Sequence, residues 1–167
     1  MNMIERRTKR LISAAALAAV WLGVSVPGSA QDDAADDVAV VDDRMWALAT
    51  NGENLAWDDA NEYCETLELA GFSDWRLPTL AELETLYDPA AEERGRVREP
   101  LELDDCCAWS STSLVELEAE AKGVLPEPSN DPADYYWGFL FPSGVRYYSF
   151  GRFPDGQAMC MREPSGD

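Results

Sequence analysis

Residues 71–83 read GFSDWRLPTLAEL, and this stretch is the starting point for predicting the fold class. Thr79 and Glu82 have the spacing of a helix-capping box, in which each side chain bonds the backbone N–H of the other residue. Pro78 restricts the conformation of the chain as it enters the helix. Gly71 stands where a glycine commonly ends a preceding helix. The stretch therefore predicts a turn that joins two helices.

The segment before this turn is the clearest helix of the chain. Its apolar residues recur at helical spacing, and acidic residues occupy the rest of its surface. Asn54 is the candidate N-cap. The residues on its apolar face are Ala56, Ala60, Tyr63, Cys64 and Leu67. The apolar stripe of the second helix consists of Leu80, Leu83, Leu86 and Tyr87. Both helices are therefore predicted to pack one face on the core.

Strands are predicted on both sides of the helices. A short strand precedes them at residues 45–49. After them the pattern predicts a strand at residues 109–112, a hairpin of residues 135–141 and 145–150, and a short strand within residues 157–162. Residues 113–134 contain several acidic residues and prolines and are predicted to form a long loop excursion. A strand, two helices and then a run of strands indicate the α+β class.

The composition indicates one globular domain and excludes several classes of function. The chain has 167 residues, 46% hydrophobic and 27% charged, which fits one domain and argues against global disorder. With 13 Lys+Arg against 32 Asp+Glu, the net charge is −19, whereas a nucleic-acid partner requires a basic face. The chain has no His, which excludes Ser-His-Asp and Cys-His catalysis and metal sites that use His. We therefore expect no His-based catalysis and no nucleic-acid partner.

The first thirty residues are predicted to be a signal peptide. Four basic residues precede an apolar run at residues 11–26, and small residues lead to a cleavage point after Ala30. The run is shorter than the about 20 residues of a bilayer span, so cleavage is favoured over an uncleaved membrane anchor. The predicted divisions are a signal peptide at 1–30, a solvated acidic leader at 31–43 that enters the first strand, a domain at 44–163 and a tail at 164–167. The mature chain would carry a net charge of −22, and we expect it in the periplasm or outside the cell, with no membrane insertion after cleavage.

The cysteines indicate disulfides, because the exported chain would reach an oxidising compartment. Four cysteines there indicate two disulfides, with three possible pairings. Cys64 lies on the predicted buried face of the first helix, where it can pack or bond to another core element. Cys106 and Cys107 are adjacent and can close a strained eight-membered ring, pair elsewhere or stay reduced. A strained disulfide is more easily reduced, but a rigid structural clip is the favoured role for this pair.

Asp74-Trp75-Arg76 places an acid, an aromatic ring and a base together and is a candidate site. The favoured interpretation is structural: Asp74 and Arg76 tie backbone in a turn, Trp75 packs, and Pro78 completes the motif. Trp109 begins a Trp-Ser-Ser-Thr stretch that offers hydroxyls without a base, so it indicates a core strand and not a nucleophile.

The predicted hairpin at residues 135–150 is crowded with aromatic residues. Strand alternation places Trp137, Phe139 and Phe141 on one face, which is predicted to join the core. Some tyrosines must then point outward, where they suit stacking on sugar rings or contact with a protein partner. The candidate ligand-binding tyrosines are Tyr135, Tyr136 and Tyr148.

An ordered set of motifs runs along the whole predicted domain. The segments are Met45-Trp46, Trp57, Ala60, Tyr63-Cys64, residues 71–79, Glu82-Leu83, residues 109–112, residues 137–139, Ser143-Gly144 and residues 160–162. This set resembles the Lcl C-terminal domain family, a bacterial domain of unknown function that is grouped with the C-type-lectin-like folds. The resemblance covers about residues 38–163.

The resemblance implies a compact domain whose termini lie close together, with two helices and a small, mostly antiparallel sheet. It also implies that Cys64 pairs with Cys160, which would tie the ends of the domain together. The best-known members of the family adhere to glycans, including sulfated ones. A sulfated ligand needs a basic face, which a chain with a net charge of −22 scarcely has, so this part of the family's function is not expected here.

The excursion contains a further candidate site. Residues 127–131 (Glu-Pro-Ser-Asn-Asp) are similar to the Glu-Pro-Asn sugar motif of calcium-dependent lectins. The candidate ligand-binding residues are Glu127, Asn130 and Asp131, and the same three with Asp134 form a candidate Ca²⁺ site. The companion Trp-Asn-Asp motif before the last cysteine is missing, and Ca²⁺ takes about six to eight oxygen ligands. A solvated acidic loop is therefore favoured, and no cofactor is expected.

Together these observations predict an exported, non-enzymatic binding or adhesion module. It would recognise a glycan or an envelope or surface protein through the excursion and the aromatic hairpin. The alternative is a structural or interaction subunit of a surface or periplasmic assembly, without affinity for sugars.

Overall fold

The computed structural model describes residues 37–92, 95–120 and 131–164. The expected signal peptide at residues 1–30 lies outside the described residues, as do Glu127 and Asn130. None of the helices in the described ranges has the length and apolar character needed to cross a membrane.

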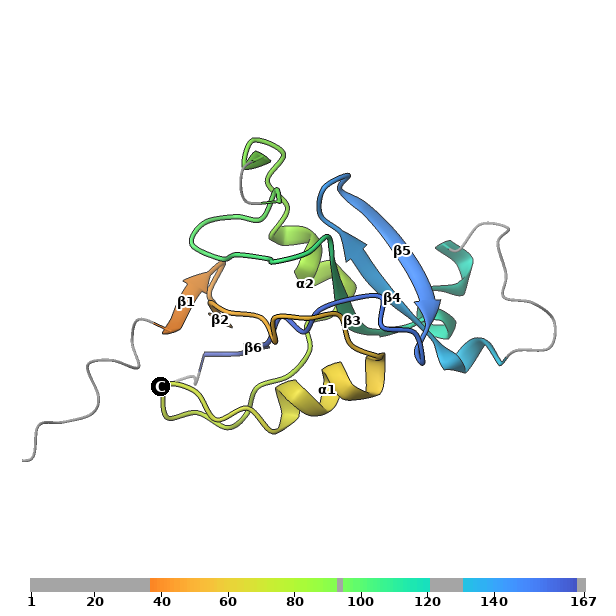
Figure 1. Cartoon of the computed structure of the whole chain (residues 1–167), viewed down its shortest axis with the longest axis horizontal. Coiled ribbons are helices and arrows are strands. Elements are labelled where there is room, and N and C mark those ends of the chain that lie inside the picture. The colour runs from red at the N-terminus through yellow and green to blue at the C-terminus, as the bar shows by residue number, and fades with distance from the viewer. Residues whose placement is uncertain (1–36, 93–94, 121–130, 165–167) are drawn as a thin grey trace, which may run out of the picture.

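The protein is α+β, as predicted, and its described residues form two α-helices and two antiparallel sheets of three strands each (Figure 1). The first sheet has the order β1 (Val38–Val41), β2 (Arg44–Ala47) and β6 (Met161–Arg162), and the second has the order β3 (Cys107–Ser113), β4 (Tyr135–Leu140) and β5 (Val145–Phe150). The helices are α1 (Trp57–Glu65) and α2 (Leu80–Thr85), with short 3₁₀ segments η3 (Leu114–Glu120) and η4 (Pro132–Asp134). The expected single sheet is therefore divided into two.

Strand β1 falls inside the range expected to be a solvated acidic leader, residues 31–43. Three of its four residues are valines, which favour a strand. Asp42 and Asp43 have φ angles of 50° and 61°, a conformation that Asp tolerates in tight turns, and they reverse the chain into β2. The valines therefore pair with β2, and the expectation of a solvated leader was wrong for residues 38–41.

Helix α1 forms where the pattern predicts it, but its ends differ from the expected ones. Its N-cap is Ala56, without a side-chain cap, and Asn54 lies two residues earlier in the chain, where its amide N–H donates to Asp105 at 2.8 Å. Its C-cap is Thr66, and Gly71 serves a separate turn between Leu69 and Phe72, with φ at 80°. Tertiary contacts and a second turn therefore set the ends of this helix.

Helix α2 begins as the capping box predicts. The side chain of Thr79 accepts from the backbone N–H of Glu82 at 3.3 Å, and the Glu82 carboxylate accepts from the Thr79 N–H at 2.7 Å. The helix is short, ending at Thr85 with Leu86 as its C-cap. Leu80, Leu83 and Leu86 are buried, which confirms the predicted apolar stripe.

The sheet β3–β4–β5 has a hydrophobic cluster on each face. On one side, Ala108, Trp137 and Phe139 pack with the leucines of α2. On the other side, Trp109 packs with Ala60 and Cys64 of α1 and with other buried residues. Figure 1 accordingly shows α1 and α2 on opposite sides of β3. The two faces of one strand thus hold both helices in place.

The ends of the domain lie side by side because β6 pairs with β2. The Cys64–Cys160 disulfide reinforces this arrangement, joining α1 to the segment before β6 with the Cα atoms 5.4 Å apart. This is the pairing that the family resemblance implies. The last strand is shorter than residues 157–162, because Gln157 instead forms a parallel bridge with Ala108 of β3.

Candidate functional site

The residues of Asp74-Trp75-Arg76 point to separate partners. The carboxylate of Asp74 accepts two hydrogen bonds from Arg162, at 2.7 and 3.0 Å, and the Arg162 side chain is 3% exposed. The hydrogen bond from Arg162 holds the pKa of Asp74 below its usual value. The guanidinium of Arg162 also lies over the ring of Phe72, with its Cζ 3.8 Å from the ring centroid. This side of the motif is a structural clamp between the turn and β6.

Arg76 is bound by a different carboxylate. It donates two hydrogen bonds of 2.9 Å to Glu82 and a third, of 3.0 Å, to Glu163. Arg76 also donates to the Leu77 carbonyl, so it ties backbone as well as pairing with carboxylates. The acid and the base each have a structural partner, so they do not form a joint site.

The rest of the motif is part of the core. Trp75 is 2% exposed, and its indole donates to the Phe72 carbonyl at 3.2 Å. Pro78 is buried, and its carbonyl accepts the backbone N–H of Ser111 at 2.7 Å, which links the turn to β3. The structural interpretation of the whole motif is therefore the one that its contacts support.

The Arg76–Glu82 pair makes stability depend on pH. Burial of the Glu82 carboxylate raises its pKa, but hydrogen bonds from Arg76 and Thr79 outweigh this effect and lower the pKa from 4.5 to about 2. A group whose pKa is lower in the folded state stabilises the fold above its unfolded pKa. This stabilisation is present above pH 4.5 and is lost as the pH falls through about 2.

Glu82→Gln is expected to lower the free energy of unfolding at neutral pH by roughly 2 kcal/mol, a figure reduced for the partial exposure of Arg76. The loss should shrink as the pH falls from 4.5 to about 2, because over that range Glu82 takes up a proton in the unfolded chain but stays ionised in the folded protein. Urea unfolding across this range measures it, with Glu62→Gln on the exposed face of α1 as the control. Parallel stability curves for wild type and Glu82→Gln would contradict the prediction.

A continuous series of aromatic rings, which we call the aromatic ladder, begins on the β4–β5 hairpin and ends in the turn after β5. Its members are Trp137, Tyr148, Tyr135, Phe150 and Phe153. Successive ring centroids lie 5.3 Å apart for Trp137–Tyr148, 6.3 Å for Tyr148–Tyr135, 5.1 Å for Tyr135–Phe150 and 5.8 Å for Phe150–Phe153. Exposure rises from 5% at Trp137 to 56% at Phe153. The ladder therefore has a buried, rigid end and an accessible end.

An arginine lies at the accessible end of the aromatic ladder. The Arg152 Cζ is 5.2 Å from the Phe150 ring centroid, within the range of a cation–π contact. Every other arginine in the described ranges pairs with a carboxylate, and Arg152 does not. This end of the ladder thus combines the exposed ring of Phe153 with a cation that no acid of the described residues neutralises.

The structure separates the three tyrosines proposed for ligand binding. Tyr135 and Tyr148 belong to the aromatic ladder. Tyr136 lies on the other face of the hairpin, stacked on Trp57 with ring centroids 3.6 Å apart, and is not part of this surface. Burial, together with the charges of Asp58 and Asp134, raises the pKa of Tyr136. Alternation along β4 could have placed Tyr136 away from Tyr135.

Sequence reasoning missed two members of this surface, Arg152 and Phe153. They follow β5 in a turn where the Phe153 N–H bonds the Phe150 carbonyl at 2.9 Å, which brings the rings of Phe150 and Phe153 together. The Phe-Gly-Arg-Phe run directly after the predicted hairpin was the available signal.

The acidic excursion is described in part. Asp131 caps η4, accepting the Ala133 N–H at 3.0 Å, and Asp134 is exposed. Glu127 and Asn130 lie outside the described residues. No group of three or more Cys, Asp or Glu side chains within the described part of the chain is arranged to hold a metal ion. The candidate Ca²⁺ site stays a prediction.

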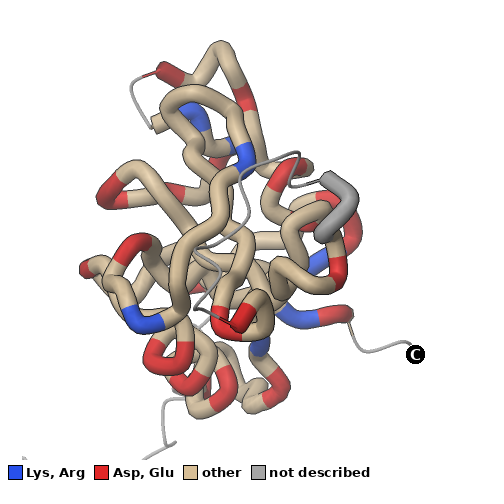
Figure 2. Tube along the Cα trace, turned by 90° about the vertical axis from the view of Figure 1, so that its right-hand side faces the viewer, with Lys and Arg blue, Asp and Glu red and all other residues tan. Residues whose placement is uncertain are grey.

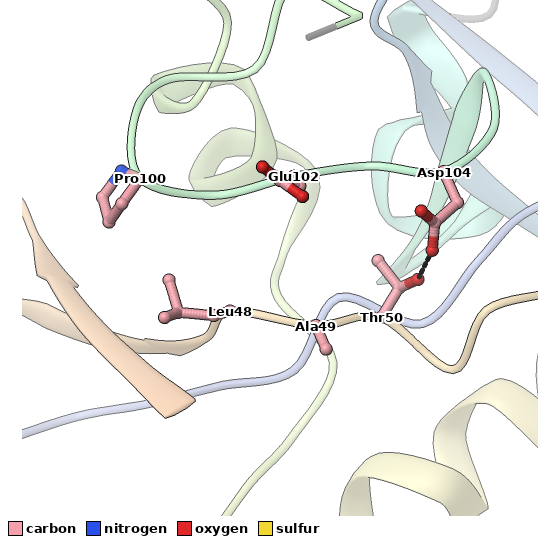
Figure 3. A pocket seen from close by; sticks show the side chains of 6 residues that line it. All are labelled: Leu48, Ala49, Thr50, Pro100, Glu102 and Asp104. Atoms are coloured by element: carbon pink, nitrogen blue, oxygen red, sulfur yellow. Dashed lines mark hydrogen bonds between the residues drawn. The ribbon is translucent and has the colours of Figure 1, made fainter. Parts of the chain in front are cut away.

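A groove of about 310 Å³ lies between the loop after β2 and the loop before β3 (Figure 3). It is lined by Leu48, Ala49, Thr50, Pro100, Glu102 and Asp104. Thr50 donates to Asp104 at 3.4 Å, and Figure 3 shows these side chains pointing toward each other. This groove could not be predicted from local sequence patterns, because its two walls are about 50 residues apart in the chain.

The family model of the Lcl C-terminal domain matches residues 39–162. The chain belongs to the Lcl C-terminal domain family. No curated protein matches the chain.

The matched Lcl C-terminal domain includes all six strands apart from the first residue of β1, both α-helices and both disulfides. The second disulfide joins the adjacent Cys106 and Cys107 at the start of β3. Of the alternatives considered for this pair, the closed ring is therefore the one found.

Acidic residues are spread over the surface of this Lcl C-terminal domain, and Figure 2 shows few basic residues among them. Arg96 pairs with Glu92 at 3.6 Å, and Arg98 pairs with Asp42. These pairings reduce the positive charge that a sulfated polymer would require.

Proposed function

We propose that this protein is an exported, non-enzymatic binding module of C-type-lectin-like architecture that recognises a glycan through the aromatic ladder. The observation that carries the proposal is the continuous series of rings from buried Trp137 to exposed Phe153. Aromatic faces bind the apolar faces of sugar rings, and a ring held by its neighbours loses little freedom on binding. The accessible end of the ladder is thus a preorganised platform.

Three features support the C-type-lectin-like architecture. The strands next to the two ends of the domain pair with each other, as β2 and β6. A disulfide joins the first helix to the last strand region. The hairpin that carries the aromatic ladder follows residues 113–134, the range predicted to form a long excursion.

Export is supported by the sequence of residues 1–30 and by the two disulfides. The basic start, the apolar run and the small residues at its end are the pattern of a secretory signal. Disulfides persist in oxidising compartments and are rare in the cytosol. The proposed location is the periplasm or the cell exterior.

Electrostatics favour a glycan without sulfate groups. The mature chain would carry a net charge of −22, which repels polyanions. Arg152 is the exception among the described arginines, and a single cation on Phe150 is too little charge for a sulfated polymer. The proposed ligand is therefore a neutral or amino sugar.

A protein partner is the second candidate. Tyr, Phe and Arg are enriched at the centres of protein interfaces, and the exposed end of the aromatic ladder has this composition. In that case the domain would be an interaction subunit of an envelope assembly, without affinity for sugars.

Phe150→Ala and Phe153→Ala are each expected to weaken glycan binding about tenfold, because one stacked ring is worth about 1.4 kcal/mol. A glycan array identifies the ligand, and calorimetry then measures the dissociation constants of the variants. Tyr63→Ala, on α1 and outside the ladder, is the matched control and should bind like the wild type.

The assay is repeated with and without Ca²⁺ and with heparin. We expect Ca²⁺ independence, and heparin binding that disappears at physiological ionic strength, where screening acts within about 8 Å. Salt-resistant heparin binding, or a domain that binds no glycan but captures an envelope protein, would contradict the glycan proposal.

A further inference from the structure

We propose that Cys106–Cys107 is a thiol–disulfide exchange site, which reacts with a neutral or positively charged dithiol while Cys64–Cys160 remains intact. Such a reaction would give the domain a reducible site at the start of β3. The inference is independent of the glycan proposal, because it rests on a different part of the surface.

The two disulfides differ in accessibility. Cys64 and Cys160 are 0% and 1% exposed and lie inside a hydrophobic cluster with Trp75, Leu77 and Trp109. Cys106 is half-buried, and Cys107 is 8% exposed. An attacking thiolate must reach a sulfur atom, and exposed disulfides are the labile ones. Cys106 is therefore the most exposed of the four disulfide-bonded cysteines, and its sulfur is the expected point of attack.

The surroundings of Cys106 select the attacking thiol by charge. The Asp105 carboxylate accepts the Cys106 N–H at 2.7 Å, and Asp104 beside it is exposed. The two loops that meet here, residues 48–54 and 99–107, contain five acidic residues and no basic one. A thiolate that carries further negative charge is repelled more strongly than one that does not. The fitting reagent is thus a dithiol without carboxylates, or one on a basic protein.

The reaction balances as an ordinary exchange. A thiolate of the dithiol attacks Sγ of Cys106, the Cys106–Cys107 bond breaks, and Cys107 leaves as a thiolate that takes up a proton. The second thiol of the reagent then attacks the mixed disulfide and releases Cys106 as a thiol. Two electrons pass to the protein, and the dithiol is oxidised to a disulfide.

Reduction would loosen a point at which the loop before β3 is hydrogen-bonded to three other segments of the chain. The Cys106 carbonyl accepts the Phe141 N–H at 3.0 Å, and the Cys107 carbonyl accepts the Gln157 N–H at 2.9 Å. Asp105 also holds Asn54. Because the core clusters do not depend on this bond, we expect a local loosening of the loop before β3 and no global unfolding.

The experiment treats the folded protein with increasing dithiothreitol, traps free thiols with iodoacetamide and maps the labelled peptides by mass spectrometry. We expect two labels at Cys106 and Cys107, with Cys64–Cys160 intact and the near-UV circular dichroism retained. Labelling of Cys64 and Cys160 first, or no labelling until the protein unfolds, would overturn the proposal.

A second measurement tests the charge selection. At low ionic strength, Asp104→Asn and Asp105→Asn should each raise the reduction rate on the order of twofold with dithiothreitol and fivefold with glutathione, whose thiolate carries one more negative charge. Glu62→Gln on α1 makes the same change of charge elsewhere and should leave both rates unchanged. Equal rate changes for the two reagents, or for the control, would refute the charge selection.

Discussion

Replacing Cys64 and Cys160 together with alanine is expected to lower the free energy of unfolding by about 4–5 kcal/mol. The disulfide joins residues separated by 96 positions. In the chain-entropy model, a cross-link over such a loop lowers the conformational entropy of the unfolded chain, which stabilises the folded state by this amount. Urea unfolding of the oxidised protein measures the change. The double substitution avoids the free thiol that a single one would leave.

The matched control is the double substitution of Cys106 and Cys107 by alanine. It also removes two sulfurs and one disulfide, but the two residues are adjacent, so the bond closes almost no chain. This variant should lose far less stability. If both double variants were equally destabilised, loop entropy would not be the source of the effect.

Trp109→Ala is expected to destabilise the domain by about 3–5 kcal/mol, because a buried tryptophan leaves a large cavity. Trp109 is 0% exposed and packs against Tyr147, with ring centroids 5.9 Å apart. Its indole donates to the Leu55 carbonyl at 2.8 Å, an acceptor that the variant leaves without this donor. Thermal and urea unfolding both measure the loss.

Trp109→Phe separates packing from hydrogen bonding. It keeps most of the ring volume and removes the N–H donor, so it should cost less than the alanine variant. A loss below about 1 kcal/mol for Trp109→Ala would show that the cluster around α1 can close over the cavity.

Local sequence signals predicted the elements that short-range physics controls. Thr79 and Glu82 satisfy each other within one turn, so the start of α2 was predictable from their spacing. The β4–β5 hairpin follows from alternating aromatic residues on either side of a turn at residues 142–144. The burial of Trp137 and Phe139 follows from the same alternation.

Contacts between distant residues account for most of the differences. Asn54 was a plausible cap by residue type, but the helix begins two residues later, and the amide N–H of Asn54 donates to Asp105, which is 51 residues away. The acidic context of Val38–Val41 indicated a solvated leader, yet pairing with β2 makes it a strand. The local sequence around Asn54 does not contain Asp105, and the local sequence around Val38–Val41 does not show that β2 will pair with it.

The same division holds for the candidate site. The sequence located the aromatic hairpin and two ring positions of the aromatic ladder that were proposed for ligand binding, Tyr135 and Tyr148. The turn after β5 decided that Phe153 and Arg152 join them, and the packing of Trp57 decided that Tyr136 does not. The groove of Figure 3 depends on two loops that meet only after folding.

By itself, the sequence determined the α+β class, the capping of α2, the hairpin, the acidic charge and, through its ordered motifs, the family. Tertiary structure decided the division into two sheets, the ends of α1 and the partners of Asp74 and Arg76. The physical reason is range. Capping, turn formation and strand alternation act within a few residues, whereas sheet pairing and ion pairs join residues as distant as Asp74 and Arg162, 88 positions apart.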